Sequence, residues 1–202
     1  MASGLRSLGH EAEPVTLAGL EEEGGPTGGI NLDTHIDQVA RLLDGEDRAV
    51  LVGHSYAGSV ITGVADRWAE RVAALLYIDA FVPRDGESCW SMTNDEQRRW
   101  YAEGAGRTGL GVEPLPFFDE RARPHPLGSL MQRSSLTGAH HAVGRRLYLA
   151  AVGSPWIASS PFVATADRLR HDPAWSVVDL DCGHNVMAYA FDDLLRLTVT
   201  LA

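Results

Sequence analysis

The most regular feature of the chain is an alternation between short, continuous apolar runs and longer segments in which apolar residues recur every three or four positions. Continuous runs are typical of strands buried on both faces, and the longer period is typical of amphipathic helices. The predicted strands are Glu11–Leu17, Ala49–Gly53, Ala73–Val82, Leu147–Val152 and Ser176–Leu180. The predicted helices are Met1–Leu8, Asn31–Asp44, Ala57–Glu70, Pro161–Arg170 and Tyr189–Leu201. Strands that alternate with helices predict an α/β fold, in which a mostly parallel sheet carries helices on both faces.

The alternation is interrupted between residues 84 and 145. This segment is rich in aromatic residues, Pro, Arg and Gly, and its periodicity is weak. We therefore predict a core of residues 1–83 and 146–202 with a lid inserted at 84–145. Aromatic side chains of a lid are expected to line an apolar substrate pocket, although they can also form the core of the lid itself. The aromatic residues in question are Trp90, Trp100, Tyr101, Phe117 and Phe118.

Composition narrows the range of functions. The chain has 202 residues and a net charge of −10, and all 17 of its basic residues are Arg. This balance argues against a nucleic-acid-binding protein and against attachment to anionic lipid. No apolar run approaches the roughly 18–20 residues of a membrane span, and the first residues lack the apolar region of a secretory signal. We expect a cytoplasmic protein in which Cys89 and Cys182 are reduced and no metal or cofactor is bound.

The segment Gly53-His54-Ser55-Tyr56-Ala57-Gly58 carries the clearest chemical signal. It lies directly between a predicted buried strand and a predicted helix, and it matches the pattern G-x-S-x-G with Ala57 at the last position. In a nucleophile elbow the backbone turns so tightly that only small residues fit beside the serine, whose Oγ then projects from the sheet. The sequence therefore predicts Ser55 as a nucleophile and the backbone N–H of Tyr56 as a donor to the oxyanion.

Three stretches together resemble the α/β-hydrolase superfamily, and most closely its small esterase-like branch related to plant methyl esterases and hydroxynitrile lyases. The stretches run from Asn31 to Arg67, from Leu75 to Ser88 and from Asp181 to Met187. The resemblance covers nearly the whole chain and implies a triad in the chain order serine, acid, histidine. It points to His184 as the base, because a Gly-His pair follows the last strand in this branch. His54 is expected to point away from Ser55 and to pack or hydrogen-bond locally. His140 and His141 are expected to be solvated residues of the lid, with substrate contact as the alternative.

The acid of the triad does not stand where the resemblance places it. That position follows the strand Leu147–Val152, and the chain contains no Asp or Glu between Glu120 and Asp167. Asp79, at the end of the preceding strand, is the predicted replacement, because some α/β-hydrolases carry the acid at that strand end. A carboxylate there can still orient the histidine and stabilise its imidazolium. Asp85 is the second choice.

The resemblance also implies a strand before Glu11 that ends in a His-Gly loop and supplies the second oxyanion donor. Residues 1–10 contain no such strand. Three explanations stay open: a start placed too far downstream, a truncated natural protein in which Glu11–Leu17 pairs beside the elbow strand, or a strand supplied by a partner chain, as in a homo-oligomer. With one oxyanion donor lost, we expect kcat to fall about 10²–10³-fold.

These features predict a serine hydrolase that cleaves a small carboxylic ester or lactone through an acyl-enzyme. Ser55 attacks the carbonyl, His184 takes the proton, and Asp79 holds His184. Two alternatives remain: a degenerate hydrolase that serves as a binding or scaffold protein, and a lyase that uses the same triad, because a fold does not determine its chemistry.

Overall fold

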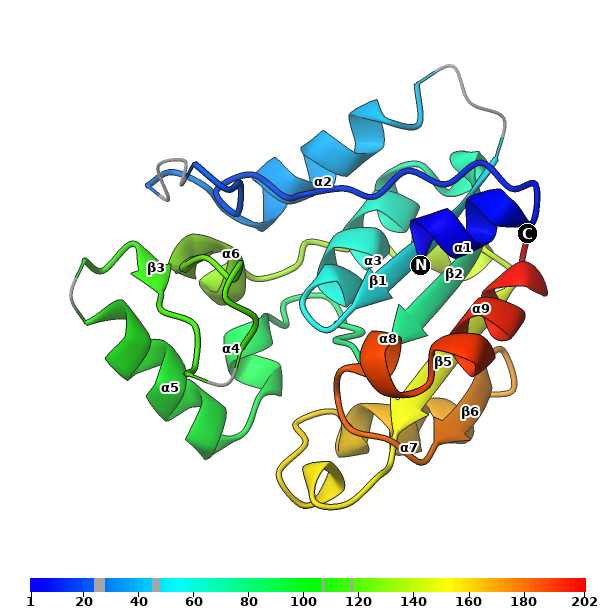
Figure 1. Ribbon diagram of the computed structural model, residues 1–202. Coiled ribbons are helices and arrows are strands. Elements are labelled where there is room, and N and C mark those ends of the chain that lie inside the picture. The colour runs from blue at the N-terminus through cyan, green and yellow to red at the C-terminus, as the bar shows by residue number, and fades with distance from the viewer. Residues whose placement is uncertain (24–27, 45–47, 107, 117) are drawn as a thin grey trace.

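A parallel sheet forms the centre of the computed structural model, which describes residues 1–23, 28–44, 48–106, 108–116 and 118–202. Within these residues the sheet has four strands in the order β1-β2-β5-β6, and every neighbouring pair is parallel (Figure 1). The strands are β1 (Ala49–His54), β2 (Val72–Ile78), β5 (Arg146–Ala151) and β6 (Ser176–Leu180). The predicted α/β fold is therefore confirmed, and the four apolar runs that follow Asp44 all form strands.

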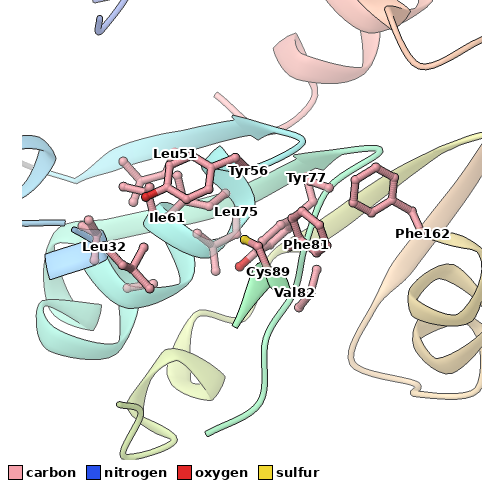
Figure 2. Packing of buried hydrophobic residues seen from close by; sticks show 14 of the residues in the cluster. Leu32, Leu51, Tyr56, Ile61, Leu75, Tyr77, Phe81, Val82, Cys89 and Phe162 are labelled. Atoms are coloured by element: carbon pink, nitrogen blue, oxygen red, sulfur yellow. The ribbon is translucent and has the colours of Figure 1, made fainter. Parts of the chain in front are cut away.

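Helices cover both faces of this sheet, because successive side chains of a strand point to opposite sides. On β2, Leu75 and Tyr77 belong to the larger core cluster, and Leu76 and Ile78 belong to the second cluster. Figure 2 shows the larger cluster, with Tyr56 of the elbow packed among the side chains. The helices on this face are α2 (Leu32–Arg41), α3 (Ala57–Arg67) and α7 (Val163–Arg170). Those on the opposite face are α1 (Ala2–Ser7), α8 (Val186–Tyr189) and α9 (Phe191–Val199).

The segment predicted as a lid forms its own short elements at one side of the sheet, drawn green in Figure 1. They are α4 (Cys89–Met92), α5 (Asp95–Ala105), the antiparallel pair β3 (Gly111–Val112) and β4 (His125–Pro126), and α6 (Leu127–Met131). Tyr101 is buried, and the rings of Trp90 and Trp100 lie 6.4 Å and 5.1 Å from it. These aromatic residues thus contribute to the packing of the segment itself. That the segment closes over a substrate stays a prediction.

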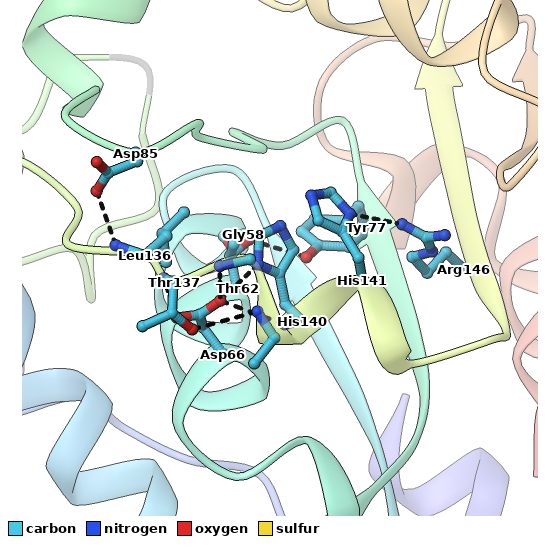
Figure 3. Close-up of polar contacts among 12 residues, drawn as sticks. Gly58, Thr62, Asp66, Tyr77, Asp85, Leu136, Thr137, His140, His141 and Arg146 are labelled. Carbon is cyan, nitrogen blue, oxygen red and sulfur yellow. Dashed lines mark hydrogen bonds and ion pairs between the residues drawn. The ribbon is translucent and has the colours of Figure 1, made fainter.

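The end of this segment is anchored to α3 by a buried carboxylate. Asp66 accepts a 2.8 Å hydrogen bond from Nδ1 of His140, which lies in a 3₁₀ turn, Ala139–Ala142 (Figure 3). The His140 side chain is only 9% exposed, so the expectation that it is solvated is wrong. Its burial depends on a partner 74 residues away in the sequence, which periodicity cannot reveal.

The predicted strand Glu11–Leu17 is also wrong. Residues 10–16 have no regular structure, and this stretch is held along α2, where the side chain of Gln38 donates to Thr16 O and accepts from Ala18 N. Strand β1 pairs with β2 alone among the described strands, so the stretch has no strand partner. Side chains bond to backbone groups of the stretch instead: the Gln38 amide to Thr16 O and the Arg6 guanidinium to Ala12 O.

Two smaller expectations concern the end of β2 and the state of the two cysteines. β2 ends at Ile78 rather than at Val82, because Asp79 leaves the strand with a φ of +41°. The two cysteines are confirmed as free and buried. Within the described ranges, no helix is long and apolar enough to cross a membrane.

Candidate active site

Ser55 occupies a strained turn between β1 and α3. Its φ is +54°, in the left-handed region that side-chain-bearing residues rarely adopt. The backbone of β2 and the residues after it hold this turn: Ser55 N donates to Ile78 O at 3.2 Å, and Phe81 N donates to Ser55 O at 3.1 Å. Such strain persists only where the surroundings enforce it, and it is typical of functional residues.

Two glycines make the turn sterically possible. A Cβ on Gly53 would lie 2.8 Å from the backbone of Ala57, and a Cβ on Gly58 would lie 2.2 Å from the carbonyl oxygen of Phe81. The close approach therefore falls on Gly58, one position after the last position of the G-x-S-x-G pattern. Ala57 is tolerated there because the segment that contains Phe81 contacts the next residue of the helix.

Tyr56 follows the nucleophile candidate and precedes the first residue of α3. A backbone N–H at a helix N-terminus has no intrahelical acceptor and is available to a developing negative charge. In the part of the chain that the structure describes, the Tyr56 N–H has no hydrogen-bond acceptor. It fits the predicted oxyanion donor in this respect, and that role stays a prediction.

His184 and Asp79 meet at the carboxyl end of the sheet. Nδ1 of His184 donates to Oδ2 of Asp79 at 2.7 Å, and the Asp79 side chain is only 2% exposed. The neighbouring Asp79 oxygen accepts from Ala151 N at 3.3 Å. Because Nδ1 carries the proton, Nε2 of a neutral His184 is left as a free base. The pair has the geometry that a base and its orienting acid require.

His54, which precedes Ser55, also holds the loop that carries His184. Nε2 of His54 donates to His184 O at 2.9 Å, and the two imidazole rings lie 4.4 Å apart. Burial lowers the pKa of His54 to about 3, and the neighbouring His184 adds to this shift. His54 is therefore a neutral donor at physiological pH. Its partner lies 130 positions away in the sequence, so the expectation of a local hydrogen bond is wrong.

The other candidates lie outside this pair. Asp85 is exposed and accepts from Leu136 N at 2.9 Å (Figure 3). Within the described residues, the carboxylate that pairs with His184 is that of Asp79, not that of Asp85. Phe118 is 42% exposed and lies 5.6 Å from the ring of Trp100. Phe117 lies outside the described residues.

Behind the elbow, a chain of buried polar groups links Tyr56 to α2. His35 is fully buried, its Nε2 donates to Ala18 O at 3.0 Å, and its Nδ1 accepts from the Tyr56 hydroxyl at 2.7 Å. The ring of His125, from β4, lies 4.5 Å from that of Tyr56 and donates from Nε2 to Ser129 Oγ. Burial lowers the pKa of His35 and lowers that of His125 to about 3.

Two aromatic residues beside His184 were not predicted from the sequence. Trp156 and Phe162 pack against its ring at centroid distances of 4.7 Å and 5.4 Å. One signal was present: Trp156 lies in the loop in which the acid was expected. A polar-tipped aromatic residue in place of an acid indicates that the loop still reaches the site.

Comparison with known proteins identifies the architecture. The sequence profile of the alpha/beta hydrolase family matches residues 4–199 of the chain. The chain belongs to this family. A carbendazim hydrolyzing esterase from a Nocardioides strain is 33% identical over 92% of this chain and 86% of its own length. A putative chloroplastic methylesterase of Arabidopsis thaliana is 26% identical over 55% of this chain and 40% of its own, which confirms the likeness to plant methyl esterases.

Solved structures of other alpha/beta hydrolases share the fold. An extracellular alpha/beta-hydrolase from a Paenibacillus species superposes with a TM-score of 0.81 at 21% identity, over all of this chain and 91% of its own. A pyrethroid hydrolase superposes with a TM-score of 0.72 at 17% identity, over 98% of this chain and 88% of its own. At these identities the likeness concerns the fold alone.

Proposed function

We propose that this alpha/beta hydrolase is a serine hydrolase that cleaves a small carboxylic ester or lactone. Oγ of Ser55 attacks the carbonyl carbon while Nε2 of His184 accepts the hydroxyl proton. Asp79 holds the resulting imidazolium, and the Tyr56 N–H donates to the oxyanion. The imidazolium then protonates the leaving alkoxide. Water, deprotonated by His184, attacks the acyl-enzyme and releases the acid and Ser55.

The observation that carries this proposal is the 2.7 Å hydrogen bond from His184 Nδ1 to Asp79 Oδ2. It joins residues 105 positions apart in the sequence, at the same sheet end as the strained Ser55. Both Ser55 and Asp79 have positive φ values, and these are the side-chain-bearing residues with positive φ among those described. Strain concentrated on the two residues that the chemistry would use supports a catalytic rather than a structural role.

The substrate class is inferred from relatives and from the site. The names of the carbendazim hydrolyzing esterase and of a mycobacterial lipase, 28% identical over 77% of this chain, both support hydrolysis of an ester-type bond. The proposed steps need only protein side chains and water. The lid aromatics Trp90, Trp100 and Tyr101 are proposed to shape the acyl or alcohol pocket, and Phe117 and Phe118 stay predicted members of it.

The test is labelling by a fluorophosphonate probe, which reacts with an activated serine, followed by mass spectrometry of the labelled peptide. We expect labelling of Ser55 in the wild type and none in Ser55→Ala. Asp79→Asn should reduce the rate of labelling and of p-nitrophenyl acetate hydrolysis about 10²–10⁴-fold. Asp85→Asn, which alters the second candidate acid, should leave both rates unchanged.

Two results would overturn the proposal. An unlabelled but folded wild type would favour the alternative of a binding or scaffold protein, whereas labelling without ester hydrolysis would favour a lyase. Near-normal hydrolysis by Asp79→Asn would remove Asp79 from the triad even if Ser55 is labelled.

A further inference from the structure

Trp156 shares the carboxylate oxygen that His184 uses. Nε1 of Trp156 donates to Oδ2 of Asp79 at 2.8 Å, and Nδ1 of His184 donates to the same oxygen at 2.7 Å. We propose that Trp156 is a positioning residue for the triad. Its indole N–H fixes the carboxylate of Asp79 and weakens the attraction between that carboxylate and the protonated His184. This inference rests on the proposed function.

The loop after β5 is built to place Trp156 at this point. A Cβ on Gly153 would lie 2.7 Å from the backbone of Cys182, so only glycine permits the two loops to approach this closely. Gly153 N donates to Cys182 O at 2.9 Å, and Ile157 N donates to Gly153 O at 3.1 Å. The loop that follows β5 is therefore tied to the loop that carries His184, and Trp156 begins a 3₁₀ turn between these contacts.

Trp156 also restricts the histidine ring. Its indole lies 4.7 Å from the imidazole of His184 with 30° between the planes, and Phe162 lies 5.4 Å away with 16° between the planes. These aromatic contacts limit the rotation of the imidazole about its side-chain bonds. One tryptophan thus holds the acid by its N–H and the base by its ring.

The shared oxygen has a consequence for proton transfer. Each hydrogen bond to a carboxylate stabilises its negative charge, so the indole N–H makes Asp79 a weaker partner for the imidazolium than a carboxylate bound by His184 alone. The buried titratable groups beside the pair are neutral at physiological pH, because burial lowers the pKa of His54 and raises those of Tyr148 and Cys182. Two charged groups lie farther out: Asp181, in the loop of His184, is exposed, and Arg168, which interacts with Tyr148, donates to Val82 O. Asp79 is therefore the charge that the imidazolium contacts.

The decisive variant is Trp156→Phe, which keeps an aromatic ring and removes the N–H. We expect kcat for p-nitrophenyl acetate to fall about tenfold while KM stays within about twofold, because the indole N–H is already bonded to Asp79. The acid limb of the kcat/KM profile should move upward by about 0.5 to 1 pH unit, since the freed carboxylate stabilises the protonated His184 more strongly. Trp175→Phe, the same replacement where the ring packs on Tyr77, should match the wild type.

A second measurement does not need activity. The ring of His184 can be titrated by histidine-selective NMR, with the signal assigned by its loss in His184→Gln. Trp156→Phe should raise the midpoint of that titration, and Trp175→Phe should not. An unchanged midpoint, or a fall in kcat that is equal at every pH, would overturn the proposal and leave a packing role. Failure of Ser55 labelling in the wild type would instead refute the proposed hydrolysis, and the two failures are thus distinguishable.

Discussion

Asp66→Asn tests the most heavily bonded carboxylate described in the structure. Oδ1 of Asp66 accepts from Gly138 N, His140 N and His140 Nδ1 at 2.9, 3.2 and 2.8 Å, and Oδ2 accepts from Thr137 N and Thr137 Oγ1 at 2.6 and 3.0 Å (Figure 3). An asparagine has one acceptor oxygen and one amide group. If its oxygen takes the place of Oδ1, its NH₂ faces the N–H of Thr137, and two donors oppose each other.

The cost follows from these contacts. An orphaned buried N–H costs about 1–3 kcal/mol, and the hydrogen bonds that remain lose their charge assistance. A hydrogen bond to a charged group contributes about 1 kcal/mol more than one to a neutral group, and several such bonds lose the charge in this variant. We expect Asp66→Asn to lower the free energy of unfolding by about 3–5 kcal/mol at pH 7, measured by urea denaturation with tryptophan fluorescence.

The pH dependence gives an independent check of the same reasoning. Burial raises the pKa of the Asp66 carboxyl, but hydrogen bonds from His140 and Thr137 outweigh burial and hold that pKa well below its usual range. Because the folded-state pKa is depressed, the stabilisation is complete above about pH 5 and is lost as the pH falls below about 4. The difference between wild type and Asp66→Asn should therefore shrink in acid.

The control is Asp85→Asn. Asp85 is exposed and accepts one hydrogen bond, from Leu136, which precedes the residues that Asp66 binds. We expect this variant to change the free energy of unfolding by less than about 1 kcal/mol. If Asp66→Asn costs no more than Asp85→Asn, the carboxylate does not anchor the segment and the reasoning is refuted.

Two further predictions concern the buried histidines and the elbow. Burial lowers the pKa of His54 and His125 to about 3, so below about pH 6.5 the unfolded state binds more protons than the folded state. As the pH is lowered from about 6 to about 4, the free energy of unfolding should therefore fall by about 1.4 kcal/mol per pH unit for each histidine. Urea titrations at several pH values measure this slope, and a flat profile would contradict it. Tyr56→Phe removes the only hydroxyl donor to Nδ1 of His35 that the described contacts contain, and it should cost about 1–3 kcal/mol in the same assay, unlike Tyr189→Phe at an exposed position.

Much of the fold could be predicted because its signals are local. The runs that became β2 and β5 are buried on both faces, so their continuous apolar character is visible without any knowledge of their neighbours. β6 lies at the edge of the sheet and exposes Ser176 and Asp179, and its signal is the shorter run around its two valines. The prediction of a strand at Glu11–Leu17 failed because a strand forms only where another strand pairs with it. That pairing cannot be predicted from the stretch itself.

The residues of the candidate site also differ in whether a local signal in the sequence marks them. Ser55 and its glycines form one continuous motif whose steric demands are local, and His184 is marked by its place after the last strand. Asp79 could be proposed only because the expected loop holds no acid. Trp156 could not be proposed, since its contact with Asp79 depends on how closely Gly153 lets two loops approach.

The sequence by itself determined the four strands of the sheet, the helices α3, α7 and α9 beside them, and which serine stands at the strand-to-helix turn. Hydrophobic period and the steric requirements of a tight turn act within about a dozen residues and are therefore readable in one dimension. Only the tertiary structure decided that Asp79 meets His184 105 positions away, that Trp156 shares its oxygen, and that His140 is buried on Asp66. Each of these contacts depends on strand order and loop packing, which bring distant residues within hydrogen-bond range and exclude water from them.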